Sequence, residues 1–169
     1  MEQTKKLTLL ANLLAIAIVL NIIESAIPII PVPGAKIGFA NIVTLIVLYI
    51  YGFKDAMTLS LLRVLLVGVL AGRLLGPTFM MGLSGAVVST IVMGLMKKSD
   101  FFGILGVSVI GAFFHALGQI TAGIFVIGSV AVLAYLPIML LVSVPAGALT
   151  GIIATKFYGI WSSWQNIQR

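Results

Sequence analysis

The chain has 169 residues, of which 61% are hydrophobic and 8% are charged, and its mean hydropathy is +1.24. Soluble domains are typically about 45–50% apolar and about 25% charged, so this composition excludes a water-exposed surface and predicts a protein surrounded by lipid. The formal net charge of +6 is better explained by cations at the cytoplasmic ends of membrane helices than by nucleic-acid binding. The lack of cysteine excludes disulfides, thiolate metal sites and cysteine nucleophiles.

Six apolar stretches follow one another along the chain and predict a single membrane domain over residues 1–169. A helix needs roughly 20 apolar residues to cross a bilayer, so the second stretch is short and the last two are long enough to tilt or break. Pro137 and Pro145 are expected to kink or divide the sixth stretch. The predicted fold is an all-α bundle of six transmembrane helices, with bounds at about 7–27, 37–51, 56–75, 78–96, 101–127 and 130–157.

The distribution of cations predicts the orientation of these helices. With the N-terminus in the cytoplasm, only Lys36 and Arg73 lie outside, while Arg63 falls within the third stretch. The first stretch ends without a small-residue cleavage site, so we expect it to be retained and not removed as a signal peptide. The prediction is a multi-pass protein of the cell membrane (inner or plasma membrane) with both termini in the cytoplasm. The cations on that side are Lys5, Lys6, Lys54, Lys97, Lys98, Lys156 and Arg169.

The connection between the first two stretches has an unusual composition for a loop. Pro28, Pro31 and Pro33 lack a backbone donor and have a fixed φ, so they predict a stiff, extended segment. Lys36 adds a single cation to a segment that is otherwise apolar. Such a loop suits the rim or lid of a binding cavity better than a simple connection.

Polar side chains within the apolar stretches are the candidate site residues, because each is costly in lipid unless it is paired or hydrated. Placed by depth, they converge on the outer half of the bundle, beside Lys36 of the loop. This pattern favours a pocket open to the outside over a pore, which should show polar groups through its whole depth. The candidate substrate-binding residues are Asn21, Glu24, Lys36, Asn41, Arg73, His115 and Gln119.

Each candidate also has a purely structural interpretation. Glu24 could act only as a counter-ion, His115 could pack between helices, and Asn41 and Gln119 could bridge helices by hydrogen bonds. Arg63 could pair with Glu24, extend toward the cytoplasm or hold an anionic ligand. His115 has no second His or Cys at ligand spacing, so no metal site is expected.

The acidic residues argue against an enzyme. Glu2, Glu24, Asp55 and Asp100 are widely separated, so magnesium-dependent prenyl or phosphoryl transfer would lack its carboxylate cluster. The chain contains no P-loop motif and no G-x-S-x-G motif. Binding is the function that these residues support. We expect no cofactor, and the energy for any transport would come from another protein.

Small residues four apart allow helices to approach closely in lipid. Gly68, Gly72 and Gly76 form such a ridge in the third stretch and predict packing within the protein. Ala11 and Ala15 lie in the cytoplasmic half of the first stretch. They either pack internally or present a smooth face to another membrane protein.

Several segments carry a family resemblance. The run P-V-P-G-A-K-I-G-F-A-N-I-V-T-L-I-V-L-Y-I-Y-G at 31–52 resembles the signature of the Gx transporter family, historically labelled heptaprenyl diphosphate synthase component I. The resemblance continues through S-L-L-R-V-L-L-V-G-V-L-A-G, S-G-A-V-V-S-T-I-V-M, I-L-G-V-S-V-I-G-A-F-F-H-A-L-G-Q-I and Y-L-P, the last at 135–137. Family members often read H-N-L-G-Q, and here Ala116 replaces the asparagine, so no asparagine ligand is available at that point.

The resemblance implies a substrate-binding S component of an energy-coupling factor (ECF) transporter, with six membrane helices. In that class an Ala-x-x-x-Ala face on the first helix contacts the transmembrane coupling protein, and Ala11 and Ala15 match it. The loop between the first two helices gates the pocket, which corresponds to Pro28–Lys36. The implied mechanism is capture of a small molecule from outside, followed by toppling of the S component on the coupling protein, driven by two cytoplasmic ATPases.

The substrate is predicted only as a chemical class. Lys36 and Arg73 could complement an anionic group, which fits an amphipathic isoprenoid or quinone-related compound, and a water-soluble vitamin is the rival. Two other functions stay open. One is a self-sufficient secondary transporter, and the other, disfavoured, is a membrane subunit of a prenyl diphosphate synthase.

Overall fold

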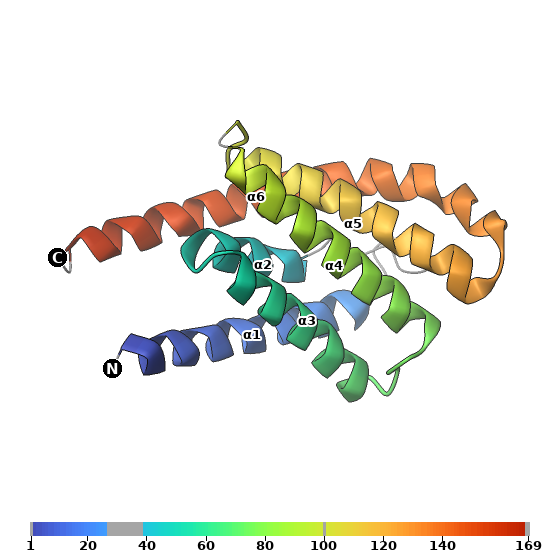
Figure 1. Cartoon of the computed structure of the whole chain (residues 1–169), viewed down its shortest axis with the longest axis horizontal. Helices are drawn as coiled ribbons and strands as arrows, with labels where there is room; N and C mark the ends of the chain where they lie inside the picture. Colours follow the sequence, from blue (N-terminus) through green and yellow to red (C-terminus); the bar gives the residue numbers. More distant parts are fainter. Residues whose placement is uncertain (1, 27–38, 100, 168–169) are drawn as a thin grey trace.

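The computed structural model describes residues 2–26, 39–99 and 101–167, and these residues contain helices and no strand (Figure 1). Two short breaks separate helices that would otherwise run together: Tyr51 and Gly52 after the second helix, and a 3-10 segment before the last. The elements in chain order are α1 (Glu2–Ala26), α2 (Phe39–Ile50), α3 (Phe53–Leu70), α4 (Pro77–Lys98), α5 (Ile104–Ile127), η1 (Val130–Tyr135) and α6 (Leu136–Ile167).

Local sequence explains where these helices begin and end. Gly52 has φ of 93°, a left-handed conformation that glycine tolerates, and it reverses the chain between α2 and α3. Pro77 occupies the first turn of α4, where its missing N–H costs no hydrogen bond. Gly128 ends α5 in the left-handed conformation, and its N–H donates to the carbonyl of Ile124 at 2.9 Å.

The end of the third helix differs from the sequence prediction. α3 ends at Leu70 and not near residue 75, because Gly72 (φ 62°) and Leu75 (φ 63°) adopt left-handed conformations that end the helix. The predicted glycine ridge is therefore wrong beyond Gly68, since Gly72 and Gly76 lie outside α3. Gly68 itself packs closely, and a Cβ there would lie 2.6 Å from the Phe79 ring.

The sixth stretch is divided, as its prolines predict. The chain forms η1 first, and α6 then begins at Leu136, so Pro137 lies in the first helical turn. The second proline, Pro145, lies inside α6 and does not end it. α6 instead continues to Ile167, well beyond the predicted end near residue 157.

The helices pack as two groups, which are joined by α2 and by a direct contact between α3 and α4. α5 lies along both α4 and α6 with the most extensive contacts, while α1 and α3 pack on the other side of α2 (Figure 1). α2 contacts both groups and is the most deeply buried helix. Residues 42–48 are all buried, and Leu45 and Val47 are fully enclosed. A helix covered on every side needs an apolar surface all round, which explains why the second stretch shows no polar face except at its start.

Both termini lie at the same end of the bundle, at the left of Figure 1. The α2–α3 connection and the last turn of α4 lie at that end too, so Lys5, Lys6, Lys54 and Lys97 gather there. The α3–α4 connection, which carries Arg73, lies at the opposite end (Figure 1). These four lysines therefore lie at one end of the bundle and Arg73 at the other.

Four of the described helical segments are long and apolar enough to cross a membrane: Gln3–Ser25, Pro77–Lys98, Ile104–Ile127 and Val130–Trp164. α2 contributes a shorter apolar helix, Asn41–Ile50. α3 is 18 residues long and carries Lys54, Asp55 and Arg63, so it is less apolar than these four segments.

Candidate functional site

A buried arginine organises the polar residues of the first three helices. The Arg63 side chain on α3 is 3% exposed, and its Nη1 and Nη2 atoms each donate a hydrogen bond of 3.2 Å to Asn41 Oδ1 on α2. Glu24, 7% exposed on α1, interacts electrostatically with the same guanidinium. We call Glu24, Asn41 and Arg63 the Arg63 cluster. It joins three helices through charged and polar groups, and the electrostatic interaction of Arg63 with Glu24 agrees with the interpretation in which these two residues pair.

Two buried hydroxyl groups accompany this cluster. Thr44 follows Asn41 by three residues on α2, and Ser60 precedes Arg63 by three residues on α3, so each lies on the same helix face as its neighbour. Thr44 Oγ1, Ser60 Oγ and Arg63 Nε are buried without a hydrogen-bond partner among the described residues. Ser60 did not stand out from the sequence, and its spacing from Arg63 is the signal that would have identified it.

His115 and Gln119 lie at a different interface, between α5 and α4. A Cβ added at Gly85 would lie 2.7 Å from Gln119 Cγ and 3.0 Å from His115 Cε1, so both side chains pack directly on this glycine. Gln119 is 4% exposed, and His115 is half-buried. The two residues share a face of α5, as their spacing predicts.

The remaining candidates are more dispersed. Asn21 is half-buried on α1, three residues before Glu24, and its carbonyl accepts a hydrogen bond of 2.7 Å from Ser25 Oγ. Arg73 is exposed in the α3–α4 connection. Lys36 and the predicted gating loop, Pro28–Lys36, lie outside the described residues.

A small cavity lies where α2, α4, α5 and α6 meet, and Asn41 forms part of its wall. It offers about 20 Å³ of space to a water molecule, which is enough for one ordered water and far below the roughly 300 Å³ of a typical ligand pocket. Asn41 is the one lining residue that the sequence pointed to. The cavity is lined by Asn41, Leu45, Ser89, Met93, Ser108, Ala112, Gly147 and Thr150.

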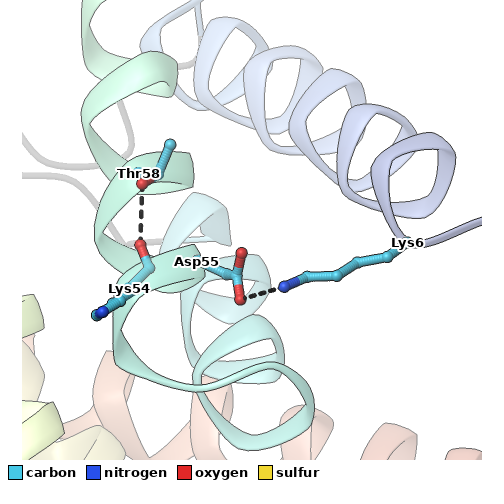
Figure 2. A network of polar contacts seen from close by, with 4 residues as sticks. All are labelled: Lys6, Lys54, Asp55 and Thr58. Atoms are coloured by element: carbon cyan, nitrogen blue, oxygen red, sulfur yellow. Dashed lines mark hydrogen bonds and ion pairs between the residues drawn. The ribbon is translucent and has the colours of Figure 1, made fainter. Parts of the chain in front are cut away.

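The end of the bundle that carries the termini holds a second polar network (Figure 2). Lys6 Nζ on α1 lies 2.8 Å from Asp55 Oδ2 on α3 and 5.3 Å from the centroid of the Tyr51 ring. Burial raises the pKa of the Tyr51 phenol, Lys6 opposes this shift, and Asp55 adds to it. Thr58 Oγ1 donates to the carbonyl of Lys54 at 2.9 Å, within the first turns of α3 (Figure 2).

A second lysine binds the same end of α2. Lys97 Nζ donates a hydrogen bond of 2.7 Å to the carbonyl of Leu48 and lies 4.9 Å from the centroid of the Tyr49 ring. The last carbonyls of a helix lack intrahelical partners and carry the negative end of its dipole, so a lysine there stabilises the helix end. Lys97 thus ties α4 to the C-terminal end of α2, while Lys6 ties α1 to α3 and to the Tyr51 ring that follows α2.

Ala11 and Ala15 are both exposed on α1. The buried positions of this helix are Leu13, Ala17 and Glu24, which lie on another face, and 17% of its apolar window is buried. The alternative that Ala11 and Ala15 pack inside the chain is therefore wrong.

These features define a multi-pass α-helical membrane protein with charged and polar groups enclosed between its helices. The family model described as heptaprenyl diphosphate synthase component I matches residues 13–157, so the chain belongs to that family. No curated protein and no solved structure gives a significant match to the chain.

Proposed function

We propose that this chain is the substrate-binding S component of an ECF-type importer, a bundle of six membrane helices with both termini in the cytoplasm. It captures a small molecule from outside and delivers it by toppling on a membrane coupling protein. Two cytoplasmic ATPases supply the energy. α2, which its neighbours cover, and α3, which stays partly exposed, complete the six spans.

The observation that carries this proposal is the outward-facing alanine face of α1. Ala11 and Ala15 are exposed one helical turn apart, on a helix whose surface is mostly uncovered by the rest of the chain. A face without bulky side chains lets a second helix approach to a short interaxial distance, where van der Waals contacts and lipid release favour association. This is the surface that a coupling protein would contact.

The chemistry of the chain supports a binding role. The four acidic residues lie far apart in the sequence, and Glu24 and Asp55 interact with Arg63 and Lys6 respectively. Magnesium-dependent prenyl transfer needs carboxylates that lie together as metal ligands, and acidic residues this far apart in the sequence do not predict such a group. These residues therefore do not support the synthase activity that the family name mentions.

The substrate we propose is a small amphipathic compound, anionic at one end and isoprenoid- or quinone-like in its body. Lys36 and the exposed Arg73 are the cations available for the anionic end. A water-soluble vitamin is the competing class. Mass spectrometry of compounds extracted from the purified protein separates the two, because retained flavin, thiamine or biotin would exclude the isoprenoid class.

Co-purification tests the proposed docking. The chain is co-expressed with a coupling protein and two ATPases, and the recovered complex is quantified for Ala11→Trp, Ala15→Trp and Ile16→Trp. Ile16 is 51% exposed on the same helix and lies about 100° around its axis from Ala15, so it controls for the bulk of tryptophan. We expect the two alanine variants to lose the complex and Ile16→Trp to keep it. Equal recovery of all three would contradict the proposal, and uptake into vesicles without any ATPase would favour a secondary transporter.

A further inference from the structure

The cavity between α2, α4, α5 and α6 has an uneven distribution of polar groups. Leu45, Met93 and Ala112 supply apolar wall, while an amide and three hydroxyl groups supply the polar part. Such a mixture is unlike the apolar lining of a dry packing defect. Its binding properties depend on which lining atoms can still donate or accept a hydrogen bond.

The orientation of the Asn41 amide follows from its contact with Arg63. A guanidinium group has only donors, so the atom that faces both Arg63 nitrogens at 3.2 Å must be the carbonyl oxygen Oδ1. This oxygen already accepts two hydrogen bonds. The Nδ2 amino group is therefore the remaining hydrogen-bonding group of Asn41, and it makes no hydrogen bond to a described residue. It is the group that Asn41 can offer as a donor to the cavity.

The two serine hydroxyls that line the cavity can only accept hydrogen bonds from a molecule inside it. Ser89 Oγ donates to the carbonyl of Gly111 at 2.8 Å, and Ser108 Oγ donates to the carbonyl of Gly147 at 2.7 Å. Each hydroxyl has a single proton, so both oxygens keep only lone pairs for the cavity. Thr150 is 5% exposed, lines the same space, and makes no hydrogen bond to any residue in the described part of the chain. Its hydroxyl can donate or accept.

We propose that this cavity is a binding site for one hydroxyl group, which accepts a hydrogen bond from Asn41 Nδ2 and donates one to Thr150 Oγ1, with the oxygens of Ser89 and Ser108 facing the same space. The space of about 20 Å³ admits one such oxygen and excludes a phosphate or carboxylate group. The hydroxyl belongs either to an ordered water molecule or to the innermost end of a bound small molecule. Both sources share the chemistry of an O–H group.

This inference rests on the proposed function where it concerns substrate. If the protein captures an amphipathic compound, the end that enters deepest carries a neutral hydroxyl, and the anionic end stays outside near Arg73. Arg63 then acts as a positioning residue, because it fixes the direction of the Asn41 amide without entering the cavity itself.

An isosteric substitution tests the site by the sign of its effect. Thr150→Val removes the hydroxyl and keeps the shape, and thermal unfolding of the purified full chain is measured in detergent. The site as proposed predicts an unfolding temperature several degrees lower. The reason is that the hydroxyl group bound in the cavity loses its hydrogen bond to Thr150, which no other described residue replaces. The matched control on the same helix is Thr155→Val, whose hydroxyl bonds to its own helix at Gly151, and it should leave the temperature unchanged. An unchanged or higher unfolding temperature for Thr150→Val overturns the proposal.

A second pair of isosteres probes the cavity from α5. Ala112→Thr and Ala112→Val both fill the space, but only threonine returns a hydroxyl to it. We expect the threonine variant to unfold at the higher temperature, and equal stability of the two, or greater stability of the valine variant, contradicts the site. The same pair at Ala122, on α5 but outside the cavity lining, measures the intrinsic difference between the two side chains.

A structure of the full chain at a resolution that shows ordered water identifies the source of the hydroxyl. An isolated oxygen near Asn41 Nδ2 and Thr150 Oγ1 identifies water, and density continuous with a larger molecule identifies a ligand hydroxyl. Either result supports the site, and an empty cavity overturns it. None of these measurements needs a coupling protein or an ATPase, so the site can fail while ATP-dependent uptake persists, and the reverse.

Discussion

Replacing Arg63 by leucine is expected to destabilise the protein more than any other single change to its polar residues. The substitution removes the cation that interacts with the buried Glu24 carboxylate, and it removes both donors from Asn41 Oδ1. Breaking a buried pair by removing one partner costs about 3–5 kcal/mol, because the remaining charge stays desolvated. The two hydrogen bonds to a charged group fall within that figure and should not be added to it. We therefore expect the free energy of unfolding to fall by about 3–5 kcal/mol.

The assay is denaturant unfolding of the purified protein in mixed micelles, followed by tryptophan fluorescence. Arg73→Leu is the control, because Arg73 is exposed and its loss should change stability by less than about 0.5 kcal/mol. Adding Glu24→Gln to Arg63→Leu removes the buried carboxylate charge and should recover part of the loss. The reasoning is refuted if Arg63→Leu behaves like Arg73→Leu, or if the second change restores nothing. Arg63 would then be held for a ligand and not for the fold.

Two further predictions concern helix contacts. Gly85→Ala should destabilise by about 1–3 kcal/mol, because its Cβ meets a backbone oxygen of α5 at 2.9 Å, whereas Gly82→Ala, with open space at its Cβ, should be neutral. Similar unfolding free energies for the two variants would disprove this close α4–α5 contact. Lys6→Met removes the ion pair with Asp55, whose partners are 40% and 25% exposed, so the loss should be about 0.2–1 kcal/mol and shrink in high salt. Lys5→Met serves as its control, and a loss that is independent of salt would show that Lys6 acts through packing.

Composition and periodicity were sufficient for the class of fold. So few charges cannot cover a water-exposed surface, and long apolar stretches in lipid must be helices, because every backbone group needs an internal partner. The order and approximate extent of the helices follow from this constraint. The end of α3 does not, because the left-handed Leu75 is a conformation that its side chain disfavours and only the surrounding structure imposes.

The sequence could identify candidate site residues only where a charged or amide side chain would be costly to place in lipid. Glu24, Asn41 and Arg63 stood out for this reason, and the structure brings them together. His115 and Gln119 stood out equally, yet they pack on Gly85 between α4 and α5. Depth in the membrane can be read from position in the chain, but the rotation of each helix about its axis cannot. That rotation is set by the packing of neighbouring side chains.

Serine and threonine in a membrane helix give a weaker signal, because they can bond to a carbonyl of their own helix. Thr90 does so with Ala86, and Thr121 does so with Leu117. Nothing in the sequence separates them from Ser108, which reaches across to α6, or from Thr150, which faces the cavity. Hydroxyls that join helices become visible only once the helices are packed.

Composition and residue order alone were enough to predict that this protein is surrounded by lipid, that it is helical, and that its cations lie mainly at one end. These properties depend on totals and on order along the chain, and the energies behind them are those of solvation. Only the packed structure shows that Arg63 hydrogen-bonds to Asn41, that Ala11 and Ala15 are exposed, and that a small cavity with a mixed polar and apolar lining lies between four helices. Those outcomes depend on which side chains meet, and that is settled by close packing between helices distant in sequence.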